Sequence, residues 1–475
     1  NEELNKDLNE EYKINYLGYG IGFQIVSQPI QSFVSKTMSN NNLMNDYGNH
    51  LTSKHFVVFL FFFLSGIFLY LILIKIVDDK IFCSFTVFLY LLYPYLFGQS
   101  LFSPKDVPFM SIWVVCTYIS FNFFDKILNK GNIDYLNTLT LSLITAYLLS
   151  IRVTGILIFI QYFITLLIFL NLQKIKFLDF IVKFYSKIIM FIFSLIFFTL
   201  LFYPPFWLNP MLFFTAVDHM SKYFNDVCTN TLGSCMHPKD LPSTYIPIWL
   251  SVKLPLLVIF GITLLPLTEK KIFVDKRKNI FFGTILITSI LLPLILIISK
   301  VHLYDELRQI MFLIPLFFLI GAISLYFFSK KTFYVLGILT AGLFIIENIK
   351  TNPYQYVWFN LPSRYIDLTK KFELEYQGIS GREIALKISK LDNNKLCVLA
   401  NPIHTVKPYL INSNFSCFDI WQKIDTDYKR PFLAVQHVRN IKKGKSFKCT
   451  SIYEDGFKLL FHKKKFITGK LLKCE

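Results

Sequence analysis

Ten apolar segments, each 16 to 22 residues long, run through the first three quarters of the chain. A helix that crosses a bilayer needs about 20 apolar residues, because hydrocarbon offers no hydrogen-bond partner to an exposed backbone. With 54% hydrophobic and 17% charged residues, the chain also lacks the polar surface that a soluble globule requires. The sequence therefore predicts a mainly α-helical, polytopic membrane protein with about ten transmembrane helices. The expected spans are residues 56–76, 81–98, 107–124, 135–150, 153–172, 187–207, 245–266, 280–299, 309–328 and 332–348.

Basic residues in the short loops predict how these spans are oriented. One set of alternate loops holds 15 Lys and Arg residues, and the opposite set holds 7. Because cytoplasmic loops carry the excess of Lys and Arg, we expect the richer set to face the cytoplasm. Ten spans then place an N-terminal loop (1–55) and a C-terminal domain (349–475) on the outer side of a transmembrane domain (56–348). An outer N-terminus with no preceding span also predicts that a first helix is missing from this chain.

The C-terminal segment is polar enough to form a soluble unit. Runs of β-forming residues at 396–400, 432–435 and 447–453 predict strands, and residues 382–390 predict a short helix. We therefore expect a small α/β domain. From Arg364 onward it holds 22 Lys and Arg against 11 Asp and Glu, which is +11 of the total net charge of +18. On the outer side such a charge suits anionic headgroups or an acidic glycan, and no nucleic-acid partner is expected.

Six of the eight cysteines fall on the expected outer side, where an oxidising compartment permits disulfides. Cys228 and Cys235 share one loop and are the expected pair, and plain thiols are the alternative. No CxxC or Cys/His spacing typical of zinc occurs. The sequence therefore names no cofactor and leaves the need for a divalent metal open.

Charged residues gather at the outer ends of the spans, where polar chemistry is expected in a membrane protein. Lys105 and Asp106 lie between two prolines at the start of a span, where the helix dipole favours a carboxylate. Arg152 stands in a turn of two or three residues between two spans. A plain helix cap for Asp106 and interfacial snorkelling for Arg152 are the alternatives to a functional role.

A second outer turn, residues 300–309, carries Tyr304, Asp305, Glu306 and Arg308 within a few residues of the membrane surface. Guanidinium groups suit bidentate binding of phosphate. The turn is therefore a candidate anion site, with interfacial snorkelling of Arg308 as the alternative.

Five short motifs follow one another in these outer turns and after the last span. They read FGQSLFSPKDVPF at 97–109, RVTG at 152–155, DLPSTYIPIWL at 240–250, YDELRQIMF at 304–312 and NPYQYVWFN at 352–360. In this order they resemble the motifs of the GT-C membrane glycosyltransferases. The most similar groups are the dolichyl-phosphate-mannose–protein mannosyltransferases, the lipid A aminoarabinose transferases and the bacterial RgtA/B/C/D-like transferases. The resemblance covers residues 97–378 and implies a GT-C fold.

The resemblance implies catalytic roles for three carboxylates. Members of this fold carry an Asp or an Asp-Glu pair, implicated in catalysis, in an outer loop near the N-terminus. Glu10 and Glu11 occupy that place here, and Asp106 is the third candidate. Gln99 and Gln309 stand where the family motifs have histidine.

The resemblance also implies two sets of binding residues. One set is expected to bind the donor and its phosphate, and the other to form a loop that contacts substrate. The first set is Lys105, Arg152, Tyr304 and Arg308, and the second is Asp240, Tyr245, Asp305 and Glu306.

The resemblance implies transfer of a sugar from a polyprenyl-phosphate-linked donor to a protein, lipid or glycan hydroxyl on the periplasmic or lumenal side. Its bacterial members imply an integral protein of the inner (plasma) membrane, with the site and the C-terminal domain in the periplasm. Expected partners are the lipid-linked donor, the bilayer and an acceptor of unknown identity. The alternative is a non-enzymatic protein, either a transporter or an inactive relative that binds lipid-linked sugar. Transporters carry ionisable groups at the bilayer midplane, whereas the charges here lie at one surface, which favours transfer.

Overall fold

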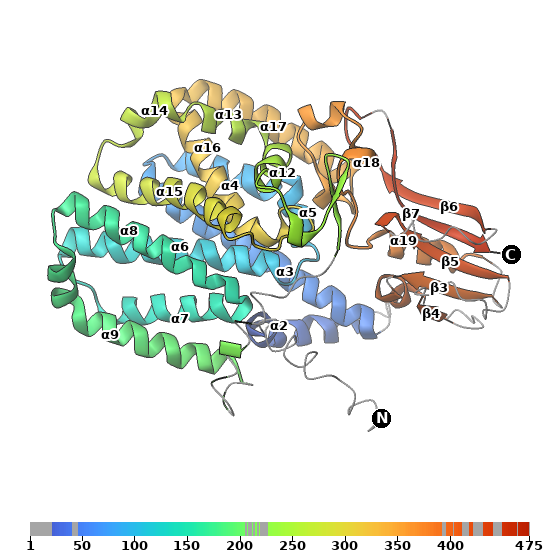
Figure 1. Ribbon diagram of the computed structural model, residues 1–475, viewed down its shortest axis with the longest axis horizontal. Helices are drawn as coiled ribbons and strands as arrows, with labels where there is room; N and C mark the ends of the chain where they lie inside the picture. Colours follow the sequence, from blue (N-terminus) through green and yellow to red (C-terminus); the bar gives the residue numbers. More distant parts are fainter. Residues whose placement is uncertain are drawn as a thin grey trace.

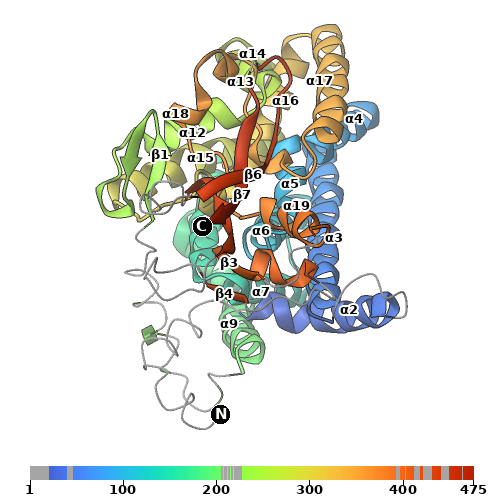
Figure 2. The same ribbon diagram turned by 90° about the vertical axis from the view of Figure 1, so that its right-hand side faces the viewer.

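The computed structural model consists of a helical bundle with a small sheet domain at one end (Figure 1). The view onto that end shows the sheet in front of the bundle, and α2 (Gly22–Ser39) lying across the bundle beside α3 (Figure 2). The fold-class prediction, a polytopic helical protein with a small α/β C-terminal domain, is confirmed. The structure describes residues 21–39, 46–204, 207, 211, 214–215, 218, 227–391, 396–401, 403–410, 418–420, 431–439, 449–462 and 464–474.

Within this described part of the chain, seven helical segments are long and apolar enough to cross a membrane. Two bent helix pairs also pass this test, and there is one shorter apolar helix, α7 (Tyr135–Ile151). Each of these ten segments lies at the position of one of the ten expected spans. The chain is an integral membrane protein. The seven segments are α3 (Asp46–Ile76), α6 (Asp106–Lys130), η1 with α8 (Val153–Leu157 and Ile158–Gln173), α9 (Phe177–Phe202), α15 (Lys276–Ile298), η3 with α16 (Arg308–Leu313 and Ile314–Phe328) and α17 (Lys330–Lys350).

Proline causes both bends. The helices α4 (Lys80–Leu92) and α5 (Pro94–Ser100) meet at 63°, and α12 (Tyr245–Lys253) and α13 (Leu256–Thr263) meet at 116°. A proline disfavours helical geometry at the residue before it, and Tyr93 and Leu254 accordingly have ψ angles of 112° and 140°. The chain then continues from α13 into α14 (Leu265–Ile272).

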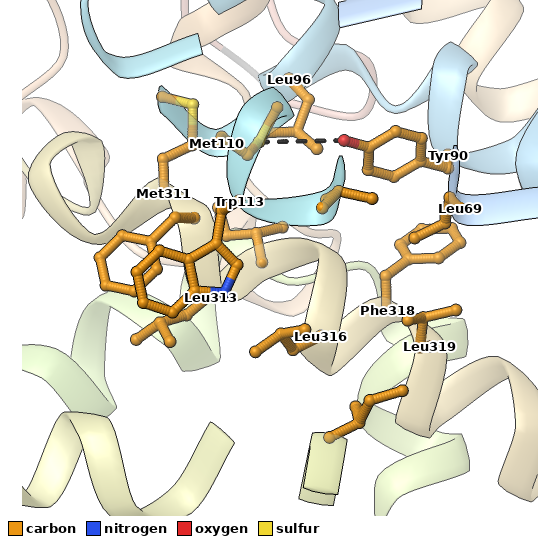
Figure 3. Close-up of a cluster of buried hydrophobic side chains, with 14 of the residues drawn as sticks. Leu69, Tyr90, Leu96, Met110, Trp113, Met311, Leu313, Leu316, Phe318 and Leu319 are labelled. Atoms are coloured by element: carbon orange, nitrogen blue, oxygen red, sulfur yellow. Dashed lines mark hydrogen bonds between the residues drawn. The ribbon is translucent and has the colours of Figure 1, made fainter. Parts of the chain in front are cut away.

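Aromatic and aliphatic side chains from several spans form the core of the bundle (Figure 3). The rings of Trp113 and Phe312 lie 4.3 Å apart, and those of Tyr90 and Phe318 lie 5.7 Å apart. Glycines allow α13 and α16 to touch, since a Cβ on Gly261 would lie 1.9 Å from the Gly321 carbonyl oxygen. The outside of the bundle is apolar as well, as expected for contact with lipid.

The C-terminal domain is a five-stranded mixed sheet in the order β4-β3-β5-β7-β6. The strand β3 (Cys397–Asn401) pairs in parallel with β4 (Phe418–Ile420) and β5 (Phe432–His437). The hairpin of β6 (Cys449–Phe457) and β7 (Phe466–Cys474) adds two antiparallel strands. Helix α19 (Ser380–Ile388) packs against the sheet, so the three strands and the helix expected from sequence are present.

The motif at 352–360 lies where the bundle meets this domain. At the end of α17, the buried carboxylate of Glu347 pairs with Arg364 and accepts a hydrogen bond from Trp358 Nε1. Arg364 Nη1 also donates to the carbonyl of Leu460 in the sheet domain at 2.9 Å. Arg364 therefore links the sheet domain to the last span. Because Arg364 and Glu347 are both buried, loss of either partner would leave an uncompensated charge at this junction.

The structure differs from the expected spans mainly at their beginnings. Helix α3 begins at Asp46, ten residues before the expected start at 56, and α9 begins at Phe177 instead of 187. The ten residues added to α9 are mostly apolar but include Asp179 and Lys183, whereas the ten residues added to α3 are mostly polar and an apolar window does not detect them. The helix α2 was not expected for the same reason, since its sequence mixes Ser and Gln with apolar residues.

Candidate functional site

Six charged side chains of alternating sign form a continuous row at the end of the bundle that carries the sheet domain. Arg152 pairs with one carboxylate oxygen of Asp106, and Arg308 Nε lies 3.3 Å from the other. Arg308 Nη1 in turn lies 3.3 Å from Asp305 Oδ2. We call the six residues the charged row, and in order they are Arg152, Asp106, Arg308, Asp305, Arg439 and Glu373.

The sheet domain contributes Arg439 to the charged row. Arg439, just after β5, places Nη2 2.5 Å from Asp305 Oδ1 and Nε 3.8 Å from Glu373 Oε1. Glu373 lies in the segment that connects the bundle to the sheet, and burial raises the pKa of its carboxyl although Arg439 opposes the shift. The row therefore joins both parts of the molecule.

Local structure explains the position of Asp106. It is the first residue of α6, where free backbone N–H groups and the helix dipole favour a carboxylate. Ser103 Oγ donates to Asp106 Oδ2 at 3.2 Å. Arg152 ends α7 with an extended backbone (φ −150°, ψ 134°), which turns its side chain out of the helix. Both residues are at the ends of spans, as expected from sequence.

The turn that carries Asp305 and Glu306 has an unusual backbone. Both residues have positive φ angles, 57° and 66°, a conformation that costs non-glycine residues roughly 1 kcal/mol or more each. Neighbouring groups hold it in place, because the Asp305 N–H donates to Thr229 Oγ1 at 3.0 Å and Tyr245 Oη donates to the Glu306 carbonyl at 3.3 Å. This turn directs the Asp305 carboxylate toward two arginines.

Glu306 belongs to a second, fully buried ion pair behind the row. Its Oε2 lies 2.9 Å from Lys253 Nζ at the end of α12, and neither side chain is exposed. Burial raises the pKa of Glu306 to about 8, and the Lys253 ammonium opposes this shift. Lys253 Nζ also donates to the Val357 carbonyl at 3.3 Å. The pair thus links the turn, α12 and the motif at 352–360.

Aromatic side chains flank the central arginine. The guanidinium carbon of Arg308 lies 5.4 Å from the Tyr304 ring centroid and 5.8 Å from that of Tyr376. Tyr376 Oη accepts a hydrogen bond from Gln99 Nε2 at 2.6 Å. The glycine before Gln99 is required here, because a Cβ on Gly98 would lie 2.1 Å from the Tyr356 nitrogen. The motif at 97–109 therefore packs directly against the motif at 352–360.

Lys105 stands at the rim, as the residue before α6. Desolvation by the surrounding protein, together with nearby Arg152, lowers the pKa of its ammonium to about 8. Lys105 is thus a cation whose charge changes close to neutral pH, near Arg152 and Arg308, whose charges do not.

The structure brings together six of the residues that the sequence singled out at separate outer turns: Lys105, Asp106, Arg152, Tyr304, Asp305 and Arg308. Tyr245 and Glu306 lie behind them as buried supports of the turn. Asp240 is exposed in the short helix η2 (Pro238–Asp240) and takes no part in the charged row. Glu10 and Glu11 lie outside the described residues.

Sequence reasoning missed Arg439, Glu373 and Lys253. Lys253 had a detectable signal, since it is a lone cation inside an expected span. Arg439 and Glu373 had none, because each is one of many charges in a basic domain. In the described part of the chain, no group of three or more His, Cys, Asp or Glu side chains is placed to hold a metal ion.

The arginines of the charged row are more exposed than its carboxylates, and this difference determines the charge of a ligand that could bind there. The arginine side chains keep 20–24% of their surface exposed, whereas the carboxylates that separate them keep 7–11%. A ligand approaching from outside meets guanidinium edges first. Such edges match the geometry of phosphate and carboxylate groups, so the row is suited to bind an anion.

No family model and no curated protein matches the sequence. Among solved structures, the chain is similar to ArnT from Cupriavidus metallidurans bound to undecaprenyl phosphate, with a TM-score of 0.49 and 11% identity over 94% of this chain and 87% of that one. It is also similar to the same protein in the apo state, with a TM-score of 0.48 and 10% identity over 94% and 92% of the two chains.

Proposed function

We propose that this protein transfers a sugar from a polyprenyl-phosphate donor to an acceptor hydroxyl at the outer surface of a membrane. The observation that carries the proposal is the charged row, in which three partly exposed arginines lie at one end of the spans. A donor of this kind keeps its hydrocarbon tail in the bilayer and its phosphate at the surface, where these arginines stand. The resemblance of the five motifs to GT-C glycosyltransferases supports the same reaction.

In this proposal Arg152 and Arg308 bind the donor phosphate and stabilise the negative charge that develops on it as the sugar leaves. In the structure the Asp106 carboxylate forms ion pairs with both arginines. A bound phosphate would compete for them and release the carboxylate, which could then accept the proton of the attacking hydroxyl. Glu10 and Glu11 remain candidates for the same role. The outer location rests on the excess of Lys and Arg in the opposite loops.

The test supplies membranes that contain the full chain with polyprenyl-phosphate sugars and measures the labelled product. We expect Asp106→Asn to lower transfer by at least about 100-fold, as loss of a general base does. Asp125→Asn is the matched control, because Asp125 lies on the same helix, has the same side-chain exposure of 10% and also pairs with two cations. It should retain at least half of the activity.

Two results would overturn the proposal. One is equal transfer by wild type and Asp106→Asn, and the other is the absence of transfer by wild type with every polyprenyl-phosphate sugar supplied. Binding of polyprenyl phosphate without transfer would identify the protein as a lipid-linked-sugar-binding relative instead.

A further inference from the structure

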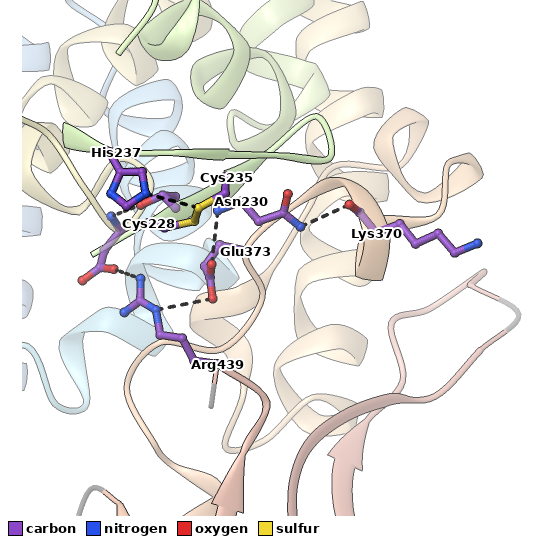
Figure 4. Close-up of a disulfide and its surroundings, with 9 residues drawn as sticks. Cys228, Asn230, Cys235, His237, Lys370, Glu373 and Arg439 are labelled. Atoms are coloured by element: carbon purple, nitrogen blue, oxygen red, sulfur yellow. Dashed lines mark hydrogen bonds and ion pairs between the residues drawn. A yellow bond between two sulfur atoms is a disulfide. The ribbon is translucent and has the colours of Figure 1, made fainter. Parts of the chain in front are cut away.

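A disulfide closes a small β-hairpin beside the charged row. The strands β1 (Thr229–Thr231) and β2 (Ser234–Met236) pair antiparallel, and Cys228 and Cys235 are joined by a disulfide (Figure 4). We call residues 228–235 the disulfide hairpin. Its position next to Arg439 and Glu373 raises the question of what the covalent link holds in place.

The first strand of the hairpin supports the strained turn. Thr229 is fully buried, and its Oγ1 accepts the Asp305 N–H at 3.0 Å. A buried N–H without a partner is costly, and this one belongs to a residue with a positive φ angle. The Thr229 hydroxyl therefore favours the backbone conformation that aims Asp305 at Arg308 and Arg439.

The same strand also binds Glu373, the second carboxylate that pairs with Arg439. The Asn230 N–H donates to Glu373 Oε2 at 3.2 Å, and the Glu373 N–H donates back to the Asn230 carbonyl at 2.8 Å. Asn230 Nδ2 donates to the Lys370 carbonyl at 3.1 Å. The Gly233 N–H also donates to the Lys371 carbonyl at 3.0 Å. Four hydrogen bonds thus fix the segment that carries Glu373 to the hairpin, and Figure 4 shows the two that Asn230 donates.

The hairpin is itself anchored to the bundle. Trp249 Nε1 in α12 donates to Thr231 Oγ1 at 3.1 Å, and Thr231 also forms a β-bridge with Phe372. A hairpin of two three-residue strands is too short to be stable by its own pairing. The disulfide keeps its two strands together, so that Thr229 and Asn230 can face Asp305 and Glu373 at the same time.

We propose that the disulfide hairpin positions the charged row, with Thr229 and Asn230 as positioning residues for the two carboxylates on either side of Arg439. This role rests on the proposed function only for the identity of the anion that the row binds. Opening the hairpin would release Asp305 and Glu373 together and leave Arg439 without a fixed place.

Amide hydrogen exchange of the full chain in lipid nanodiscs tests the proposal without an activity assay. We expect Thr229→Val, which keeps the shape and removes the acceptor, to raise exchange of the Asp305 amide at least tenfold. Thr229→Ser, which keeps the hydroxyl, should stay within threefold of wild type. Equal exchange in wild type and Thr229→Val would overturn the positioning role of Thr229.

The covalent link is tested with a second disulfide of the same chain as the control. The double variant Cys228→Ser/Cys235→Ser should raise exchange at 303–308 and at 370–373, whereas Cys449→Ser/Cys474→Ser, in the sheet, should leave both peptides unchanged. If the first variant does not fold, folded wild type is reduced by a phosphine for a short time. Cys235 is exposed and Cys474 is fully buried, so the hairpin opens first, and alkylation followed by mass spectrometry verifies which thiols are free. The same exchange after opening either disulfide would overturn the proposal.

Affinity for polyprenyl phosphate separates this inference from the proposed function. We expect opening of the hairpin to weaken binding about fivefold. If wild type binds no polyprenyl phosphate while exchange responds to the hairpin, the proposed function fails and the positioning role stands. If wild type binds it and the hairpin variants change neither exchange nor affinity, the positioning role fails.

Discussion

The two ends of α6 carry the same small arrangement of charges in different surroundings. At one end Asp125 Oδ2 accepts hydrogen bonds from Lys75 Nζ at 2.7 Å and from Arg277 Nη2 at 2.9 Å. At the other end Asp106 pairs with Arg152 and Arg308. Nineteen residues of helix separate the two carboxylates by about 28 Å, close to the thickness of the bilayer core. Each end of the helix therefore places one carboxylate between two cations near a membrane surface.

The difference lies in what surrounds each carboxylate. The Asp125 group is complete with three residues from three spans. The Asp106 group continues through Asp305 and Arg439 into the sheet domain and includes a turn with two positive φ angles. Strained backbone concentrates at functional sites because only a strong network of contacts can maintain it. An ion triad alone is thus ordinary architecture, and its extension into a strained, cross-domain row marks the candidate site.

The largest effect is expected for the buried pair behind the row. Lys253→Met leaves Glu306 buried without its partner and should lower the free energy of unfolding by about 3–5 kcal/mol. Lys75→Met at the other end should cost less, because Asp125 keeps Arg277 as its partner. Thermal unfolding in detergent measures both. The double variant Lys253→Met/Glu306→Gln should recover part of the loss, and equal costs at the two ends would contradict the comparison.

Removal of the central arginine should separate the two ends by activity. Arg308→Ala should lower sugar transfer by about 100- to 1000-fold, which is the loss found when a group that stabilises transition-state charge is removed. Arg277→Ala, the same change beside Asp125, should leave transfer within twofold of wild type. A transfer assay on membranes with matched protein amounts measures both. Similar losses in the two variants would show that both triads act on structure alone.

The smallest expected effect is a pH dependence that only the Asp106 end should show. The pKa of Lys105 is lowered from 10.5 to about 8, so the side chain is charged below pH 8 and neutral above it. Affinity for polyprenyl phosphate should therefore fall, by up to about tenfold, between pH 7 and 9. Lys105→Arg should abolish this step, and an unchanged step in that variant would assign the titration to another group.

The lowered pKa of Lys105 should affect the stability of the fold in the direction opposite to its effect on binding. Lys105 in the unfolded chain keeps its proton up to about pH 10.5, whereas the folded protein loses it near 8. Between these values the unfolded state binds more protons, so the contribution of Lys105 to stability rises with pH and is lost as pH falls through 8. Binding and stability should thus move in opposite directions over this range.

Sequence reasoning located the spans and four of the six residues of the charged row for related reasons. Long apolar runs predict membrane helices from composition alone, and charges at their ends are few enough to be noticed. Asp106, Arg152, Asp305 and Arg308 were found in this way. The beginnings of α3 and α9 were less accurate, because both helices extend beyond the apolar stretch into turns that contain charged side chains.

The other two residues of the row, Arg439 and Glu373, could not be found from sequence because they acquire meaning only in three dimensions. Arg439 is one of 22 basic residues after position 363, and no local pattern distinguishes it. Thr229 and Glu373 likewise have no motif. Their roles arise from the packing of the sheet domain and the disulfide hairpin against the turn at Asp305.

The long sequence separations within the row have a consequence for biogenesis. Arg439 follows Asp305, its partner, by 134 residues, so the ribosome completes all ten spans before it makes this arginine. Until then Asp305 has only Arg308 as its cationic partner, and Glu373 lacks Arg439. The charged row is therefore completed only in the last stage of synthesis, after the sheet has folded onto the bundle, although Arg152, Asp106 and Arg308 are made earlier. A nascent chain that stalls before β5 would hold a finished membrane domain with an unfinished site.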